Sequence, residues 1–468
     1  MTQKTGRPAA LEGKRQLFAA ELRHWRAVRR LSLRQLATRT HDSHSLLGRI
    51  ETAERLPSKE LAERLDQALN TDGAFVRIWG QIESALEAQA DQVGVDPDLG
   101  LTWGRTPAST VTTVSYLWRA DMDRRQLIVG AAWTAAAFLD PYRRWFADAI
   151  DPDTSHAGPR RIGSSEVQVM WSMARAFADA DHHLGGGYAR RTLMEFLDNT
   201  VAPILHGTYD TSTGRELLAA AARLTGLAAF MCFDSAHQGL AQRYYIQALR
   251  LAKAAGARDL GAHIFADMSM QAYELNKPRI AIAMAEAGQR AARDCGSPST
   301  EARCSMLRAR AHGLAGDSAA AAQAIGEAER YLARADLPDE PFWVQFFNEE
   351  QFAAESMYTA HDLGQASQVQ RHAPIVLKSA AGMQRREVLA ATTLAASYLP
   401  GERGRGIPVD VDRACTILVD VLPAAAGLTS ARGLAAINAV RRRLAEYGDL
   451  PAVQQVEKDF REFAGATG

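Results

Sequence analysis

Cysteine is scarce in this 468-residue sequence. The cysteines, Cys232, Cys295, Cys304 and Cys415, are too few and too scattered for a disulfide framework or a zinc site. Buried, reduced thiols in a reducing cytosol are the simplest interpretation. We therefore expect a cytoplasmic protein that depends on neither disulfides nor a structural metal.

Long apolar runs are also lacking. The sequence has no stretch of eighteen consecutive apolar residues, and residues 1–16 lack the apolar core of a signal peptide. We expect a protein that neither spans a membrane nor is exported.

Motifs of catalysis and phosphate binding are missing as well. The sequence has no G-x-S-x-G elbow, and the glycines at 185–187 are not followed by the Lys-Ser/Thr pair of a phosphate loop. Asp179, His182 and His183 resemble metal ligands, but the two histidines would point about 100° apart on a helix. We expect no enzyme activity, no cofactor and no metal.

The net charge is zero, since 54 Lys and Arg balance 54 Asp and Glu. This sum hides an uneven distribution. Residues 1–80 hold 15 Lys/Arg and 9 Asp/Glu (+6), whereas the remainder holds 39 and 45 (−6). A basic module on an acidic body is typical of a small nucleic-acid-binding part attached to a larger domain. The length predicts two to four domains.

Residues 31–57 have the pattern of two short helices joined by a tight turn. Ser32 and Ser43 are the expected N-caps, and apolar residues follow each of them at helical spacing. Further helices are predicted over 15–30, 58–69 and 75–82. Residues 1–88 should therefore fold as a five-helix domain.

The composition changes after this domain. Residues 89–120 are rich in glycine and proline and then in serine and threonine, which predicts a linker with one short extended segment at 111–117. Residues 121–215 are predicted to form a helical domain that precedes or begins the next one.

Positions in the middle of the chain recur every 40 residues. The aligned triples are Ala241, Ala281 and Ala321; Tyr245, Ala285 and Ile325; and Ala248, Gly288 and Ala328. Each triple falls in the second helix of a predicted helix pair, where small residues let neighbouring helices approach closely. Repeated helix pairs predict an α-solenoid over 216–468, with looser copies at 342–380, 384–426 and 429–464.

The N-terminal part resembles the lambda-repressor-like (Xre) helix-turn-helix family, through LSLRQLA at 31–37, Ser43, RIE at 49–51 and Pro57. The resemblance implies a structural ion pair between Arg26 and Glu51. It implies that the recognition helix reads bases with His44, Ser45 and Arg49. It also implies phosphate contacts at Ser32, Arg34 and Ser43.

The sequence departs from this family at four positions: His41, Asp42, Ala53 and Glu54. The family usually has glycine at the first and third of these, an apolar residue at the second and a basic one at the fourth. We expect weaker non-specific affinity or an altered turn. The alternative is a helical packing module that no longer binds DNA.

The helix pairs resemble tetratricopeptide repeats, although the period here is 40 and not about 34. In that family the first helices of the pairs line a groove for peptides or small molecules. The resemblance implies a groove presenting His263, Met270, Tyr273, Glu274, Arg303 and Arg310. The two arginines lie seven residues apart and could hold a carboxylate or phosphate. The alternative is that they pair internally and that Met270 is a core residue.

The combination of both modules is similar to actinobacterial regulators of development and secondary metabolism. We expect an all-α, cytoplasmic and nucleoid-associated transcription regulator that binds double-stranded DNA as a homodimer. Its repeat domain would mediate dimerisation and sense a peptide, small-molecule or protein signal. The alternative is a non-enzymatic scaffold for a protein partner, with the DNA module secondary or inactive.

Overall fold

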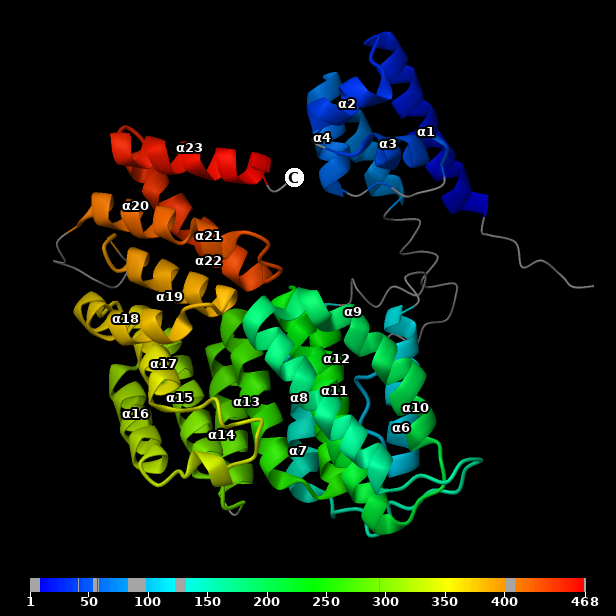
Figure 1. Cartoon of the computed structure of the whole chain (residues 1–468), viewed down its shortest axis with the longest axis vertical. Coiled ribbons are helices and arrows are strands. Elements are labelled where there is room, and N and C mark those ends of the chain that lie inside the picture. Colours follow the sequence, from blue (N-terminus) through cyan, green and yellow to red (C-terminus); the bar gives the residue numbers. More distant parts are fainter. Residues whose placement is uncertain are drawn as a thin grey trace, which may run out of the picture. The chain divides into compact units, whose positions relative to one another are not determined.

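The regular elements among the described residues are helices, with isolated β-bridges at His156 and Arg161. The computed structural model describes residues 9–40, 42–53, 57, 59–82, 98–122, 132–293, 295–400 and 409–466. The chain divides into two units, residues 1–97 (unit 1) and 98–463 (unit 2) (Figure 1). The predicted all-α fold is confirmed.

Unit 1 is a bundle of short helices: α1 (Ala9–Val28), α2 (Leu33–Thr40), α3 (His44–Glu51), α4 (Lys59–Leu69) and a helical stretch over 74–82. Their inward-facing apolar side chains form one core, which includes Phe18, Leu22, Leu36, Leu47, Ile50, Leu61, Leu65, Leu69, Phe75 and Ile82. The Phe18 and Phe75 rings meet at 5.2 Å and join the first helix to the last. The predicted five helices are thus all present.

Both predicted N-caps of the helix-turn-helix are in place. The Gln35 amide donates to Ser32 Oγ at 3.2 Å, and the Ser32 amide donates to Gln35 Oε1 at 2.8 Å, so α2 opens with a capping box. At α3 the Leu46 amide donates to Ser43 Oγ at 3.1 Å. Each cap satisfies amides that have no partner inside the helix.

Residues 98–120 do not belong to a linker, and that part of the prediction was wrong. They lie in unit 2, and the expected extended segment at 111–117 is part of the helix α6 (Pro107–Met122). The rest of the predicted linker, 89–97, lies outside the described residues. Three buried side chains in the loop before α6 and within it, Trp103, Val114 and Trp118, anchor this segment.

The threonines of α6 explain why a Ser/Thr-rich stretch becomes a helix. Thr112 Oγ1 donates to the Ala108 carbonyl, and Thr113 Oγ1 donates to the Ser109 carbonyl, both at 3.0 Å. Hydroxyls that bond one turn back along the helix need no partner elsewhere. The apolar residues of the segment recur at helical spacing and turn one face inward, so burial overrides the weak helix propensity of threonine.

The next part of unit 2 is helical, as predicted for 121–215. Its elements are the 3₁₀ turn η1 (Ala135–Phe138), α7 (Leu139–Ala147), α8 (Ser164–Leu184), α9 (Gly186–Phe196), the π-helical turn η2 (Leu197–Val201) and α10 (Ala202–Leu205). Between α7 and α8 the chain is irregular, and the His156 amide donates to the Tyr209 carbonyl at 3.1 Å across a β-bridge.

Helix pairs packed one after another make up the larger part of unit 2 (Figure 1). The pairs are α11 (Thr211–Asp234) with α12 (Gln238–Ala255), α13 (Arg258–Glu274) with α14 (Pro278–Ala292), α15 (Pro298–Ala315) with α16 (Ser318–Leu332), and α17 (Glu349–Asp362) with α18 (Ala366–Ala380). A short turn, η3 (Leu337–Asp339), precedes α17. The C-terminal helices are α19 (Gln384–Ala396), α20 (Val411–Asp420), α21 (Leu422–Ala425), α22 (Ala431–Leu444) with its extension η4 (Ala445–Tyr447), and α23 (Pro451–Ala466).

The residues that recur every 40 positions lie on α12, α14 and α16, the second helices of their pairs. Ala241, Ala281 and Ala321 are fully buried. At Gly288 a Cβ atom would lie 2.8 Å from Cys304 Sγ, so only glycine allows α14 to approach α15 this closely. The repeat therefore reflects close helix packing, as the sequence predicts.

Among the described residues one helix, α11, is long and apolar enough to cross a membrane by length and composition. Its most apolar window has a mean hydropathy of 1.5, and 83% of that window is buried inside the protein. A helix that is apolar on all sides and surrounded by other helices is the central helix of a folded domain.

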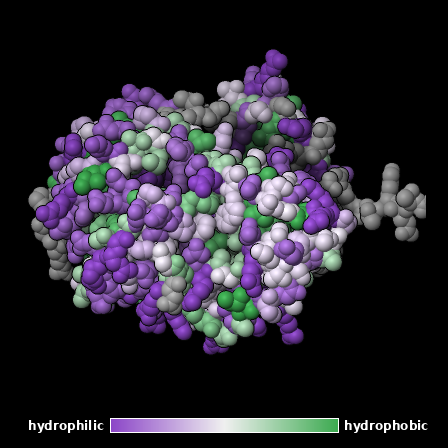
Figure 2. Space-filling view, turned by 60° about the horizontal axis from the view of Figure 1, so that its bottom comes forward, coloured by the Kyte–Doolittle hydropathy of each residue, from purple (hydrophilic) through white to green (hydrophobic). Residues whose placement is uncertain are grey.

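Polar residues dominate the face of the molecule in Figure 2, and apolar residues appear there as small separate groups. Exposed large apolar side chains, such as Val28, Tyr116, Leu139 and Tyr188, are likewise spread over different helices. Scattered exposure of this kind is normal on a folded protein.

Candidate nucleic-acid interface and an arginine-lined cavity

The helix-turn-helix is held against α1 by an ion pair. Arg26 Nε and Nη2 donate to the two carboxylate oxygens of Glu51 at 2.6 and 3.0 Å. Arg26 Nη1 also donates to the Leu31 carbonyl at 3.0 Å, which fixes the entry to α2. The Glu51 side chain is 8% exposed and that of Arg26 is 24% exposed. The sequence predicts this pair, and its two parallel hydrogen bonds fasten the last residue of α3 to α1.

Asp42, where the resembled family has an apolar residue, has a structural partner. Arg64 of α4 donates to both of its carboxylate oxygens, with Nη2 to Oδ1 at 2.8 Å and Nε to Oδ2 at 3.2 Å. An ion pair thus fastens the turn before α3 in place of an apolar contact. His41 lies outside the described residues.

Ala53, where the family usually has glycine, keeps the backbone conformation that glycine favours. Its φ is +56°, in the left-handed region. The guanidinium of Arg15 donates to the Ala53 carbonyl, and that of Arg23 donates to the Glu51 carbonyl. Two arginines of α1 therefore hold the end of α3. Glu54 lies outside the described residues.

The predicted DNA contacts lie on the exposed side of α2 and α3. Ser32, Arg34, Ser43, His44 and Arg49 are all exposed, whereas nothing is described of the side chain of Ser45. No hydrogen bond or ion pair joins the side chains of Arg34, His44 and Arg49 to another described residue. These side chains are free to meet a polyanion, while the two other serines already cap helices.

Arg39 was not singled out from the sequence, although it is an exposed cation at the end of α2. Its position, five residues after Arg34 on the same short helix, was the available signal. It adds positive charge to the exposed side of the helix-turn-helix.

A recognition helix with exposed polar side chains, capped by serine and fixed through its last residue to the first helix, defines the helix-turn-helix class of DNA-binding domain. Residues 17–77 match the family of the helix-turn-helix domain. Comparisons with curated proteins and with solved structures give no match. The helix-turn-helix domain indicates DNA binding and transcription regulation, and a long all-helical region follows it.

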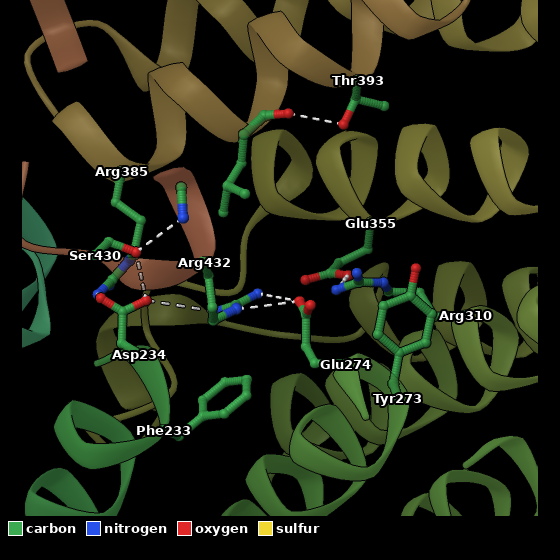
Figure 3. Close-up of polar contacts among 12 residues, drawn as sticks. Phe233, Asp234, Tyr273, Glu274, Arg310, Glu355, Arg385, Thr393, Ser430 and Arg432 are labelled. Carbon is green, nitrogen blue, oxygen red and sulfur yellow. Dashed lines mark hydrogen bonds and ion pairs between the residues drawn. The ribbon is translucent and has the colours of Figure 1, made fainter. Parts of the chain in front are cut away.

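The side chains predicted to line a groove do come together in unit 2. His263, Met270, Arg303 and Arg310 all line one cavity of about 140 Å³. Tyr273 lies under Arg310, with the guanidinium carbon 4.1 Å from the ring centre (Figure 3). The Tyr273 hydroxyl donates to Asp362 Oδ2 at 2.7 Å. Glu274 forms an ion pair at 2.5 Å with Arg432, another residue of the cavity wall (Figure 3).

Arg303 and Arg310, the two arginines predicted to bind an anion, are already paired with carboxylates of the protein. Arg303 forms an ion pair with Asp267 and donates to the His263 carbonyl at 3.0 Å. Arg310 Nη1 donates to Glu355 Oε2 at 3.1 Å (Figure 3). All of these side chains are at most 8% exposed. In this structure both arginines therefore pair internally, as in the alternative interpretation of the sequence.

A second ion-pair network on the cavity wall was not predicted. Arg385 pairs with Asp181 at 2.9 Å. Arg385 also pairs with Asp234 at 3.1 Å, and Ser430 Oγ donates to Asp234 Oδ1 at 2.8 Å (Figure 3). Burial raises the pKa of the Asp234 carboxyl, but Arg385 and Arg432 hold that pKa below its ordinary value. These partners are 151 to 204 residues apart in sequence, a separation that no local pattern reveals.

Arg223 was also missed, and it is the unusual member of the cavity wall. It lies on α11 and is 6% exposed. Its Nε atom is buried without a hydrogen-bond partner, and burial lowers the pKa of this guanidinium to about 10. Arg223 is the one charged residue in the apolar stretch 217–233, and this was a signal in the sequence because burying an unpaired charge is costly.

The residues Asp179, Asp181, His182 and His183 do not converge on a metal site. His183 Nδ1 lies 2.8 Å from the Asp179 carbonyl, and Asp181 is paired with Arg385. In the described part of the chain, no group of three or more His, Cys, Asp and Glu side chains could hold a metal ion.

Proposed function

We propose that this protein is a sequence-specific transcription regulator of the lambda-repressor-like kind. The observation that carries the proposal is the free, exposed state of His44 and Arg49 on a helix whose base is locked by Arg26 and Glu51. A rigid helix carrying unpaired polar side chains suits the major groove, where arginine can pair with guanine through two hydrogen bonds. Arg34 would contact phosphate and set the docking position.

The working form would be a homodimer. One recognition helix reads only a few base pairs, so specific binding usually requires two half-sites. The helix pairs of unit 2, which we relate to tetratricopeptide repeats, would supply the dimer contacts and a receiver for a signal. Such a regulator would act in the cytoplasm on the nucleoid and would have no enzyme activity.

The test is DNA binding by the full chain. A binding site is first selected in vitro from random duplex DNA, and its affinity is then compared between the parent protein and Arg49→Ala. We expect the variant to lose about 1–3 kcal/mol on this site, with relaxed preference at one base pair. Arg279→Ala, which removes an exposed arginine of α14, is the matched control and should bind like the parent.

Salt dependence separates this proposal from the scaffold alternative. Specific affinity should fall steeply as salt rises, because each phosphate contact releases counterions. Failure to select any preferred duplex, together with identical binding by Arg49→Ala, would leave the scaffold role as the better explanation.

A further inference from the structure

The cavity of unit 2 contains one buried arginine that has no ion-pair partner among the described residues. Its wall is formed by α8, α11, α13, α15, the segment before α17, and α17, α18, α19 and α22. Four of its arginines, Arg303, Arg310, Arg385 and Arg432, each have a carboxylate within 3.1 Å. Arg223, by contrast, makes no hydrogen bond or ion pair with any described residue.

An unpaired guanidinium at 6% exposure is a costly arrangement. The two carboxylates that attract it, those of Asp267 and Asp181, are each paired with another arginine, at 2.5 and 2.9 Å. Neither can neutralise Arg223 without abandoning its own partner. A bound anion would supply the missing hydrogen bonds and charge, so the cavity is incomplete on its own.

Apolar side chains share the rest of the cavity wall with His182, His263, Gln351 and Tyr358. They include Leu227, Phe230, Met270, Phe346, Phe347 and Leu389. The volume of about 140 Å³ is close to that of cavities of about 150 Å³ that hold a benzene molecule. The occupant should therefore combine one anionic group with a body about the size of a single ring.

We propose that this cavity binds a small organic monoanion, a carboxylate with an apolar body of about one ring, whose carboxylate pairs with Arg223. A single charge is favoured because Arg223 is the one buried arginine on the described wall that lacks a carboxylate partner. The planar guanidinium fork suits the two oxygens of a carboxylate. Arg386, a partly exposed arginine of the same wall that donates to the Met383 sulfur at 3.4 Å, would steer the anion inward.

The role of this ligand as a signal rests on the proposed function, but its binding does not. The occupant would touch α11, α13, α17 and α19 at once, and would thereby tie separate helix pairs together. Binding that differs between two arrangements of these pairs would shift the balance between them. DNA affinity would then change by the same factor as ligand affinity.

The experiment uses the full chain and four probes: benzoate, its neutral analogue benzamide, inorganic phosphate and acetate. Thermal unfolding and calorimetry should show binding of benzoate and a rise in Tm with its concentration. Benzamide lacks the charge, and phosphate and acetate lack the apolar body, so each should bind at least tenfold more weakly. Equal binding of benzoate and benzamide would overturn the proposal, as would no binding of benzoate.

Arg223→Met tests the contact itself. Methionine fills a similar volume without the charge, so the ligand-free variant should unfold at the same or a higher temperature than the parent. Benzoate affinity should fall at least tenfold. Arg223→Lys keeps the charge but loses the fork, and should retain part of the affinity, which keeps the test valid if the methionine variant folds poorly. Unchanged benzoate affinity in both variants would refute the role of Arg223.

Arg279→Met, on the exposed side of α14, is the control and should bind benzoate like the parent. The DNA measurement is then repeated with and without benzoate on the selected site. Benzoate binding with no change in DNA affinity would support the site and contradict its role in regulation. Loss of DNA binding in every sample, with benzoate binding intact, would contradict the proposed function alone.

Discussion

Removing either partner of the ion pair between Arg26 and Glu51 should destabilise unit 1, but by unequal amounts. Arg26→Ala would leave a carboxylate that is 8% exposed without its cation, whereas Glu51→Ala would leave a guanidinium that is 24% exposed. The stranded guanidinium also keeps its hydrogen bond to the Leu31 carbonyl. Breaking a fully buried pair costs about 3–5 kcal/mol. We therefore expect about 3 kcal/mol for Arg26→Ala and about 2 kcal/mol for Glu51→Ala.

Amide hydrogen exchange in the intact chain can measure these losses. Peptides covering α2 and α3 report the free energy of opening of unit 1 without separating it from unit 2. Arg39→Ala removes an exposed arginine of α2 and should stay within about 0.5 kcal/mol of the parent. The double variant should cost less than the sum of the two single variants, because the interaction can be lost only once.

Three outcomes would refute this reasoning. A larger loss for Glu51→Ala than for Arg26→Ala would mean that burial does not govern the cost. A double variant with strictly additive losses would mean that the pair contributes no interaction energy. Losses within 0.5 kcal/mol in both single variants would mean that the pair is as weak as one at the surface.

Three further predictions concern stability. Ala53→Gly should raise the free energy of unfolding of unit 1 by about 0.5 kcal/mol, because relieving the left-handed conformation of alanine outweighs the entropy that glycine adds to the unfolded chain. Lower stability of the variant in hydrogen exchange would contradict this. Burial lowers the pKa of His263 well below its ordinary value and that of His182 to about 4. The unfolded chain therefore binds more protons between about pH 6.5 and 4, and unit 2 should lose stability as the pH falls through that window; urea unfolding with equal midpoints at pH 7 and 5 would contradict this. Arg385→Met should destabilise unit 2 by about 3 kcal/mol or more, because Asp234 is fully buried and loses its nearest cation. An unchanged urea midpoint would show that Ser430 and Arg432 are sufficient to stabilise the Asp234 carboxylate.

Local signals in the sequence were enough to predict unit 1. Ser32 and Ser43 accept from amides only three residues away, and the apolar positions repeat within single helices. The Arg26–Glu51 pair is not local, but it came from the resemblance to a family in which that pair is known. The helix pairs of unit 2, by contrast, were predicted from an internal repeat, because residues 40 apart perform the same packing task.

The features that could not be predicted from the sequence depend on which residues become buried together. A Ser/Thr-rich segment such as 107–122 has no strong preference of its own, and its contact with α12 makes it helical. The roles of Arg385 and Arg223 depend on which carboxylates lie beside them, and these come from helices far away in the sequence. Composition shows that an arginine stands in an apolar helix, but only the packed structure shows whether it has a partner.

The position of Arg223 also bears on how a signal could leave the cavity. Arg223 lies on α11, and the partner helix α12 binds the first residues of unit 2 through two side chains. Gln247 donates to the Gly100 and Thr102 carbonyls at 2.9 Å. Arg250 donates to the Gly104 carbonyl at 2.6 Å. A shift of α11 toward a bound anion would therefore act, through a single tightly packed helix, on the segment that leads back to unit 1. A flexible tether over 98–120 would have absorbed such a shift. Because these residues are docked onto α12, any coupling between ligand and DNA has a continuous packed path up to residue 98, and the DNA affinity measured with and without benzoate tests whether it is used.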